Sequence, residues 1–247
     1  MIHPVGDVLA AHAFMTRLPV PRAATGPVDP ARIAPWLPLV GLTVGMVAAG
    51  ARIAADPLGP LVAAIAACAA APLVTGGFHE DGLADAFDGL GPLDRARRLE
   101  VMRDPRLGTF GALALVFSVL ARVALLAPLG WRHAAVALVT GHVVGRWSTL
   151  PLARWAPAAR TDGLGAAMRL GTPAVAAGTV VAVALVAPGL WWWGPSAVAA
   201  VPAAAGVVTA LCGWWWTRAF GGVGGDTYGA TNQLVEIAAL AALVVTL

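Results

Sequence analysis

One stretch of the sequence, GGFHEDGLADAFDGL at residues 76–90, gathers side chains that can do chemistry. One His and four carboxylates fall within it: His79, Glu80, Asp81, Asp85 and Asp88. The last three are spaced i, i+4 and i+7, so on a helix their carboxylates would lie on one face. Like charges one turn apart repel each other, and a cation between them would relieve that repulsion.

This spacing predicts a divalent metal site. Carboxylate oxygens, together with water and phosphate oxygens, are the ligands that Mg²⁺ prefers. We therefore expect Mg²⁺ to be held by Glu80, Asp81, Asp85 and Asp88. The alternative is the solvated face of an ordinary loop helix. His79 can serve as a metal ligand, a general base or a donor to phosphate, or it can be a packed residue, and the pattern does not choose among these.

A second stretch, EVMRDPRLGTFG, suits a phosphate ligand. It contains Arg103 and Arg106. The planar guanidinium group of Arg matches phosphate oxygens well. Anchoring at a membrane surface explains the same residues, so both interpretations stay open.

A third stretch, GGVGGDTYGATNQLVE at 221–236, is a glycine-rich turn that leads into an apolar run. Glycine-rich turns at the start of a helix can present backbone N–H groups to an anion. Its two acids, Asp226 and Glu236, can add carboxylates to the metal site.

Membrane-spanning helices must position these side chains. Hydrophobic residues make up 59% of the 247-residue chain and charged residues only 12%, whereas about 25% charged is usual in soluble domains. We expect an all-α, polytopic membrane bundle that forms a single domain over residues 1–247. Apolar runs of about 20 residues predict seven spans, at 33–55, 58–77, 109–129, 133–152, 172–193, 196–216 and 232–247.

Arginine is distributed unevenly between the two sides of this predicted bundle. Twelve Arg lie in the N-terminal segment and the connections 78–108, 153–171 and 217–231, whereas the intervening connections carry only Arg132. The positive-inside rule places the Arg-rich side in the cytoplasm, here at a bacterial inner membrane. Arg at the ends of spans also accounts for the net charge of +3 without a nucleic-acid partner. We expect no system of acids within the spans.

The acidic stretch resembles the signature of the adenosylcobinamide-GDP ribazoletransferase family, also called cobalamin synthases. The resemblance runs along the chain, because the second and third stretches also match family blocks. Three positions differ from the usual family residues, namely Arg103, Pro105 and Gly224. Further matching blocks are FMTRLPVP at 14–21, PLVGLTVG at 38–45, GRW at 145–147 and RTDGLG at 160–165.

The resemblance implies a reaction. Adenosylcobinamide-GDP and α-ribazole, or α-ribazole 5′-phosphate, would give adenosylcobalamin, or its phosphate, and GMP, in a step that requires Mg²⁺. His79, Asp81 and Asp85 are the expected catalytic residues, one of which takes the proton of the ribose hydroxyl. The groups expected to hold phosphates or the guanosine are Arg103, Arg106, Arg146, Arg160, Asp226 and Thr227.

Two other classes of protein stay open. The CDP-alcohol phosphotransferases carry a similar DGLA beginning, but typically have Arg where this chain has Asp85. A transporter for a cation or a corrinoid would place its polar groups near the membrane midplane and on both faces, which the one-sided clusters argue against. Spans rich in Ala and Gly permit a homo-oligomer as well as packing within one chain.

Overall fold

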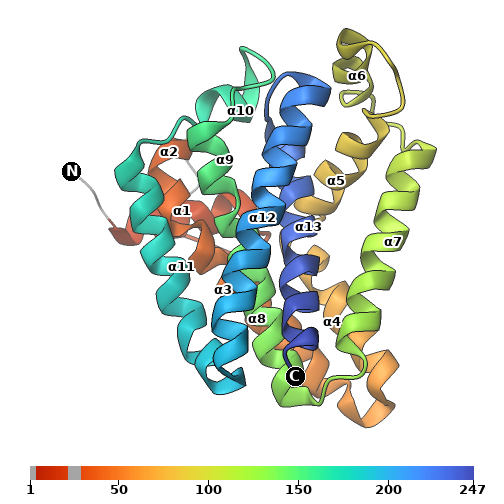
Figure 1. The fold of residues 1–247 in the computed structure, drawn as a ribbon, viewed down its shortest axis with the longest axis vertical. Helices are drawn as coiled ribbons and strands as arrows, with labels where there is room; N and C mark the ends of the chain where they lie inside the picture. Colours follow the sequence, from red (N-terminus) through yellow and green to blue (C-terminus); the bar gives the residue numbers. More distant parts are fainter. Residues whose placement is uncertain (1–3, 22–28) are drawn as a thin grey trace.

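The computed structural model describes residues 4–21 and 29–247, and it confirms the all-α fold, since this part of the chain contains helices and no strand (Figure 1). Two short 3-10 turns, η2 (Ala34–Trp36) and η3 (Asp56–Leu58), flank α3. The helices are α1 (Pro4–Met15), α2 (Pro30–Ile33), α3 (Leu37–Ala54), α4 (Pro60–Thr75), α5 (Phe78–Asp88), α6 (Arg95–Val101), α7 (Thr109–Leu126), α8 (Trp131–Trp147), α9 (Thr149–Trp155), α10 (Gly163–Ala167), α11 (Thr172–Trp193), α12 (Pro195–Phe220) and α13 (Gly225–Val245).

Each of the seven predicted spans contains most of one long helix: α3, α4, α7, α8, α11, α12 or α13. Five helical stretches are long and apolar enough to cross a membrane: Pro30–Ala54, α7, α11, α12 and α13. Helices α4 and α5 together can form a sixth, broken span. The chain is therefore a multi-pass membrane protein.

Two boundaries differ from the prediction. The predicted span 133–152 is divided, because α8 ends at Trp147 and the short α9 follows. The last helix begins at Gly225 rather than at 232, so the polar residues of the glycine-rich stretch lie on α13 itself. These residues include Thr231 and Asn232, which are fully buried against other helices. Their polarity reflects contacts inside the protein and not exposure in a loop.

Two glycines separate α4 from the acidic helix. Gly76 and Gly77 both adopt left-handed backbone conformations, with φ of 71° and 75°. Such angles are readily available only to glycine. The chain turns there, so that α5 makes an angle of 93° with α4. This turn directs α5 along α13 and α7 (Figure 1).

Glycines also allow the central helices to approach closely. Helix α3 packs on α8 so tightly that a Cβ on Gly45 would lie 2.7 Å from Val139 Cα. On another side of α8, a Cβ on Gly145 would lie 2.8 Å from the Asn232 side-chain oxygen on α13. Small residues at helix contacts are the usual solution in membranes. Helix α8 is thereby held between α3 and α13.

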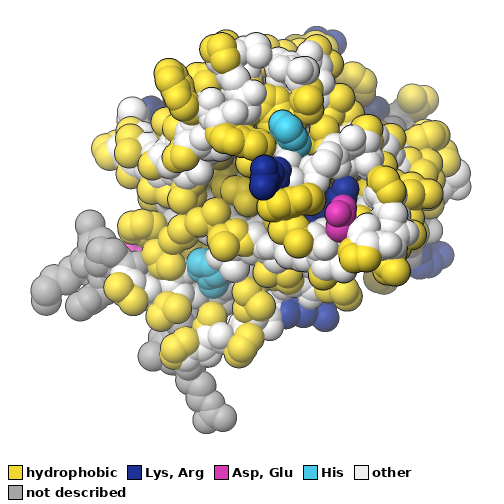
Figure 2. All heavy atoms as spheres, turned by 90° about the horizontal axis from the view of Figure 1, so that it is seen from below, with side chains coloured by type: hydrophobic (Ala, Val, Ile, Leu, Met, Phe, Trp, Pro, Cys, Tyr) yellow, Lys and Arg dark blue, Asp and Glu magenta, His cyan; other side chains and the backbone are white. Residues whose placement is uncertain are grey.

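The Arg-rich connections meet at one end of the bundle, at the top of Figure 1. Arg95 and Arg98 of α6 donate hydrogen bonds to backbone carbonyls at the end of α12, at 2.7 and 3.1 Å. Arg160 donates to the Leu99 carbonyl at 2.5 Å. Seen from the opposite end, the surface is mostly hydrophobic or uncharged, with scattered charges (Figure 2). Of the Arg counted above, Arg22 lies outside the described residues.

Candidate active site

The acidic helix α5 lies in direct backbone contact with the first turns of α13. A Cβ on Gly82 would be 2.9 Å from the Asp226 carbonyl oxygen and 3.3 Å from Gly229 Cα. The two helices can come this close only because Gly82 and Gly229 have no side chains. This contact brings α5 next to Asp226, 145 positions further along the chain than Asp81.

Three carboxylates gather at this contact. Asp81 is exposed, and Asp85 and Asp226 are partly buried. Asp81, Asp88 and Asp226 all lie close enough to Asp85 for their charges to repel its carboxylate. On the other side, the Arg160 guanidinium attracts Asp226. The predicted face of α5 is therefore formed, and α13 adds a carboxylate to it.

The chemistry of these donors fits a divalent cation. Repelling carboxylates that are half-exposed to water are stabilised by a cation, and all-oxygen donors suit Mg²⁺. Within residues 4–21 and 29–247, however, no three His, Cys, Asp or Glu side chains converge into a ready-made metal cage. Mg²⁺ commonly keeps several waters and binds one or two carboxylates together with substrate phosphates, so an open arrangement of this kind is compatible with it.

Asp88 has a different local role from that of its neighbours. Its two carboxylate oxygens accept hydrogen bonds from the backbone N–H groups of Gly108 and Gly111, both at 2.8 Å. These N–H groups belong to the first turn of α7, where they have no partner within the helix. Asp88 therefore caps α7, and the two glycines of the GTFG segment leave room for its carboxylate.

Glu80 points away from the other acids and into the bundle. Its Oε1 accepts a hydrogen bond from Gln233 Nε2 of α13 at 3.1 Å. Its Oε2 is buried and has no hydrogen-bond partner among the described residues. The structure therefore separates Glu80 from Asp81, its neighbour in the sequence, because adjacent residues on a helix point in different directions.

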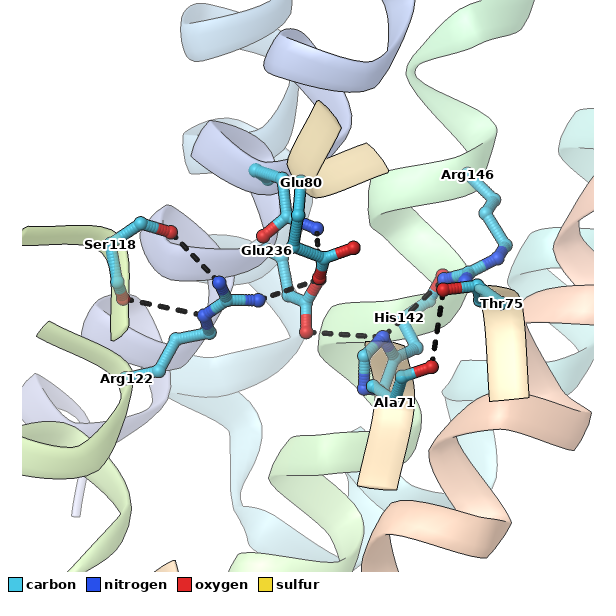
Figure 3. A network of polar contacts seen from close by, with 9 residues as sticks. Ala71, Thr75, Glu80, Ser118, Arg122, His142, Arg146 and Glu236 are labelled. Carbon is cyan, nitrogen blue, oxygen red and sulfur yellow. Dashed lines mark hydrogen bonds and ion pairs between the residues drawn. The ribbon is translucent and has the colours of Figure 1, made fainter. Parts of the chain in front are cut away.

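Below Glu80 lies a buried polar network, shown in Figure 3. Glu236 of α13 forms an ion pair with Arg122 of α7 at 3.8 Å, and its Oε1 lies 3.0 Å from His142 Nδ1 of α8. Arg122 also donates to Ser118 Oγ at 2.8 Å. Figure 3 shows Glu80 and Glu236 between Arg122 on one side and His142 on the other. The expectation that no acids lie within the spans is thus wrong, since Glu236 is only 3% exposed and sits midway along α13.

Two residues expected at the site lie inside this network. Arg146 is 1% exposed, and its guanidinium contacts His142, including a 3.2 Å hydrogen bond to the His142 carbonyl. His79 is 3% exposed, and its Nε2 has no hydrogen-bond partner in the part of the chain that the structure describes. The structure does not bring either side chain to the open carboxylate face. Buried polar atoms without protein partners often hold internal water.

A pocket of about 250 Å³ lies beside Asp226. It is lined by Arg160, by Asp226 and Thr227 of α13, and by the glycines at 224 and 225. The Thr227 hydroxyl accepts the Gly224 N–H at 2.8 Å, which closes the first turn of α13. The positive end of the helix dipole points toward this pocket. An anion that enters would meet Arg160 and the start of a 21-residue helix.

The two remaining arginines lie at the surface of this end. Arg103 pairs with Asp162 at 3.1 Å and lines a neighbouring pocket together with Arg160. Arg106 pairs with Asp104 at 2.6 Å. Hydrogen bonds from Arg106 hold the pKa of Asp104 at about 2. Arg103 is therefore placed near the pocket, whereas Arg106 is engaged with its own loop.

Comparison with known proteins identifies the family. Residues 7–244 match the family model described as cobalamin-5-phosphate synthase. The chain belongs to this family. It is 41% identical to an adenosylcobinamide-GDP ribazoletransferase of Azorhizobium caulinodans, over 96% of this chain and 94% of that one. It is 38% identical to a protein of the same name from Rhizobium etli, over 98% of this chain and 97% of that one. No solved structure matches the chain.

Membership of the cobalamin-5-phosphate synthase family confirms the resemblance seen in the sequence. It makes this chain an enzyme, a transferase with a role in cobalamin biosynthesis. It also excludes the transporter alternative. The buried charges within the spans had weakened the earlier argument that the polar clusters lie on one side only.

Some polar residues near the site were not predicted from the sequence. Arg122, His142 and Gln233 lie in apolar runs, where a single polar residue is easily overlooked. A usable signal was present on α8 and α13. His142 and Arg146 are four residues apart, as are Asn232 and Glu236, so each pair shares one helix face.

Proposed function

We propose that this transferase joins adenosylcobinamide-GDP to α-ribazole, or to α-ribazole 5′-phosphate, and releases GMP in a Mg²⁺-dependent reaction. The observation that carries the proposal is the meeting of Asp81, Asp85 and Asp226 beside the Arg160 pocket. Carboxylates for a metal and an arginine for phosphate are the two parts that transfer from a pyrophosphate requires. The full-length relatives that carry this activity in their names support the same reaction.

In the proposed reaction, the ribose hydroxyl oxygen forms a bond to the phosphorus that carries the cobinamide arm. The bond from that phosphorus to the bridging pyrophosphate oxygen breaks, and GMP leaves with that oxygen. Bound Mg²⁺, held by Asp81 and Asp226, would neutralise the charge that develops on the phosphate oxygens.

The protein's own groups supply binding and proton transfer. Arg160 and the start of α13 hold the GDP phosphates, since both present positive charge to the pocket. Asp85 is the carboxylate best suited to accept the proton from the ribose hydroxyl, because it lies one helical turn from Asp81 and next to Asp226 at the same partly open face.

The test is GMP release from adenosylcobinamide-GDP and α-ribazole by the detergent-purified protein. We expect release with Mg²⁺, none after chelation, and recovery when Mg²⁺ is restored. Asp85→Asn should lower turnover at least about 100-fold, the contribution typical of a general base. The matched control is Asp104→Asn, an acid of the same end that pairs only with its loop. Folded protein that releases no GMP with any divalent metal would refute the proposal.

We further propose that the site faces the cytoplasm at a bacterial inner membrane. The Arg-rich connections gather at the end of the bundle that carries the site, which the positive-inside rule assigns to the cytoplasm. Thr161 is exposed at this end. A Thr161→Cys variant, with Cys68 and Cys212 replaced by Ala, should react with a membrane-impermeant maleimide in inverted vesicles. Labelling in intact cells instead would reverse the orientation.

A further inference from the structure

An apolar groove runs along the outside of the bundle between α8–α9 and α12. Its volume is about 630 Å³. Its walls include Trp147, Leu152 and Trp155 on one side and Gly206, Ala210 and Trp214 on the other. Gly206 leaves the groove open, since a Cβ built there meets nothing within 4 Å. The groove therefore opens sideways, toward the region that lipid chains occupy.

A second hollow continues the groove at the Arg-rich end. This hollow has a volume of about 340 Å³ and is lined by Leu90, Arg98 and residues of α12. The two hollows share Trp214 and Arg218. No acid lines either of them. Together they form one largely apolar groove that ends at the guanidinium groups of Arg98 and Arg218.

Both guanidinium groups are held in place by contacts with neutral groups. Arg98 donates to the Pro92 and Ala219 carbonyls, at 2.7 and 3.1 Å. Arg218 lies over the ring of Trp214, with its Cζ 5.5 Å from the ring centroid. Within residues 4–21 and 29–247, neither Arg forms an ion pair with a carboxylate. Their positive charge is left available to an anion from outside the chain.

We propose that this groove binds an anionic phospholipid, with an acyl chain between α9 and α12 and the phosphate between Arg98 and Arg218. The shape and charge of the groove support this occupant. Lipid tails fit a lateral apolar groove, and basic pockets between helices near the cytoplasmic surface bind anionic headgroups. Trp155 and Trp214, which are 67% and 56% exposed, flank the groove as interfacial Trp residues do. The proposal is independent of the reaction proposed above.

The test compares lipids that differ only in headgroup charge. Phosphatidylglycerol and phosphatidylcholine with identical chains are titrated onto the detergent-purified protein, and bound lipid is counted by native mass spectrometry. We expect phosphatidylglycerol to bind more tightly. Each basic residue near a lipid surface contributes about 1 kcal/mol, or about fivefold in affinity. Arg218→Gln should therefore lower the preference about fivefold.

Two further variants keep the test decisive. The matched control is Arg132→Gln, because Arg132 lies over Trp131 at 5.1 Å in the same kind of contact but lines neither hollow. It should leave the preference unchanged. Ala210→Phe fills the groove and should weaken binding of both lipids.

Three results would overturn the proposal. The first is equal binding of the two lipids, which would mean that the Arg pair does not select a headgroup. The second is an equal loss of preference in Arg132→Gln and Arg218→Gln, which would mean nonspecific charge attraction. The third is a protein dimer that excludes lipid and that Ala210→Phe dissociates, which would mean that a second copy of the chain covers the groove.

Discussion

The contact between α5 and α13 sets the geometry of the acidic site, and Gly82→Ala tests it directly. The added methyl would lie 2.9 Å from the Asp226 carbonyl oxygen and 3.1 Å from its Cα. Both are backbone atoms, which cannot rotate out of the way as a side chain can. The two helices must separate by a few tenths of an ångström, and Asp81 and Asp85 move away from Asp226.

The cost in stability should be small. Overpacking a tight contact costs about 1–3 kcal/mol. Ala is favoured over Gly inside a helix by about 0.5–1 kcal/mol, which offsets part of this cost. The net loss in the free energy of unfolding is roughly 0–2.5 kcal/mol. For a chain of this size, each kcal/mol lowers Tm by about 2–4 °C, so the Tm of Gly82→Ala should lie no more than about 10 °C below that of the wild type.

The cost in activity should be larger. A misplacement of about 1 Å in an active site can lower the rate about 100-fold, so a shift of a few tenths should cost roughly 10-fold. GMP release measured at saturating Mg²⁺ and substrate gives this number. Gly50→Ala in α3 is the matched control, because a Cβ there meets nothing within 4 Å. Gly50→Ala should keep full activity, and its Tm should be no lower than that of the wild type.

A Gly82→Ala variant that turns over substrate at the wild-type rate would contradict this prediction. The helices would then tolerate the separation, and the closeness of Asp226 to the α5 acids would not matter for the chemistry. A low rate counts in favour only if the variant remains folded at the assay temperature. The thermal unfolding curve of the same preparation establishes this.

Three other predictions follow from named contacts. Asp88→Ala removes the cap of α7 and should lower the free energy of unfolding by about 0.5–2 kcal/mol, measured by thermal unfolding. The Mg²⁺ concentration for half-maximal activity should stay the same. A large rise in that concentration would make Asp88 a metal ligand instead. Glu236→Gln leaves Arg122 buried without its ion pair, which should lower the free energy of unfolding by about 3–5 kcal/mol. Adding Arg122→Met should recover part of this loss in the same unfolding assay. No recovery would show that the two residues are not coupled. Arg160→Gln removes a charged hydrogen-bond donor worth about 1.5–3 kcal/mol, so kcat/KM for adenosylcobinamide-GDP should fall about 10–100-fold. Substitution of the exposed Arg97 by Gln is the control and should not change kcat/KM. Equal effects of the two substitutions would place the phosphate elsewhere.

The amino-acid sequence by itself determined the spans and the acidic face. Apolar runs long enough to cross a membrane are a local property, and each predicted run corresponds to a helix. The spacing of Asp81, Asp85 and Asp88 is local too, since a helix brings every third and fourth residue to one side.

Only the tertiary structure decided what each polar side chain contacts. Asp88 caps a helix whose N-cap residue, Gly108, lies 20 positions later, and Glu80 turns toward Gln233 across 153 positions. Arg146 and Glu236 became interior residues because α8, α13 and α7 enclose them. In a membrane interior, a polar side chain is stable only where another helix supplies its partner. That partner is chosen by helix packing between distant segments, which no local pattern in the sequence specifies.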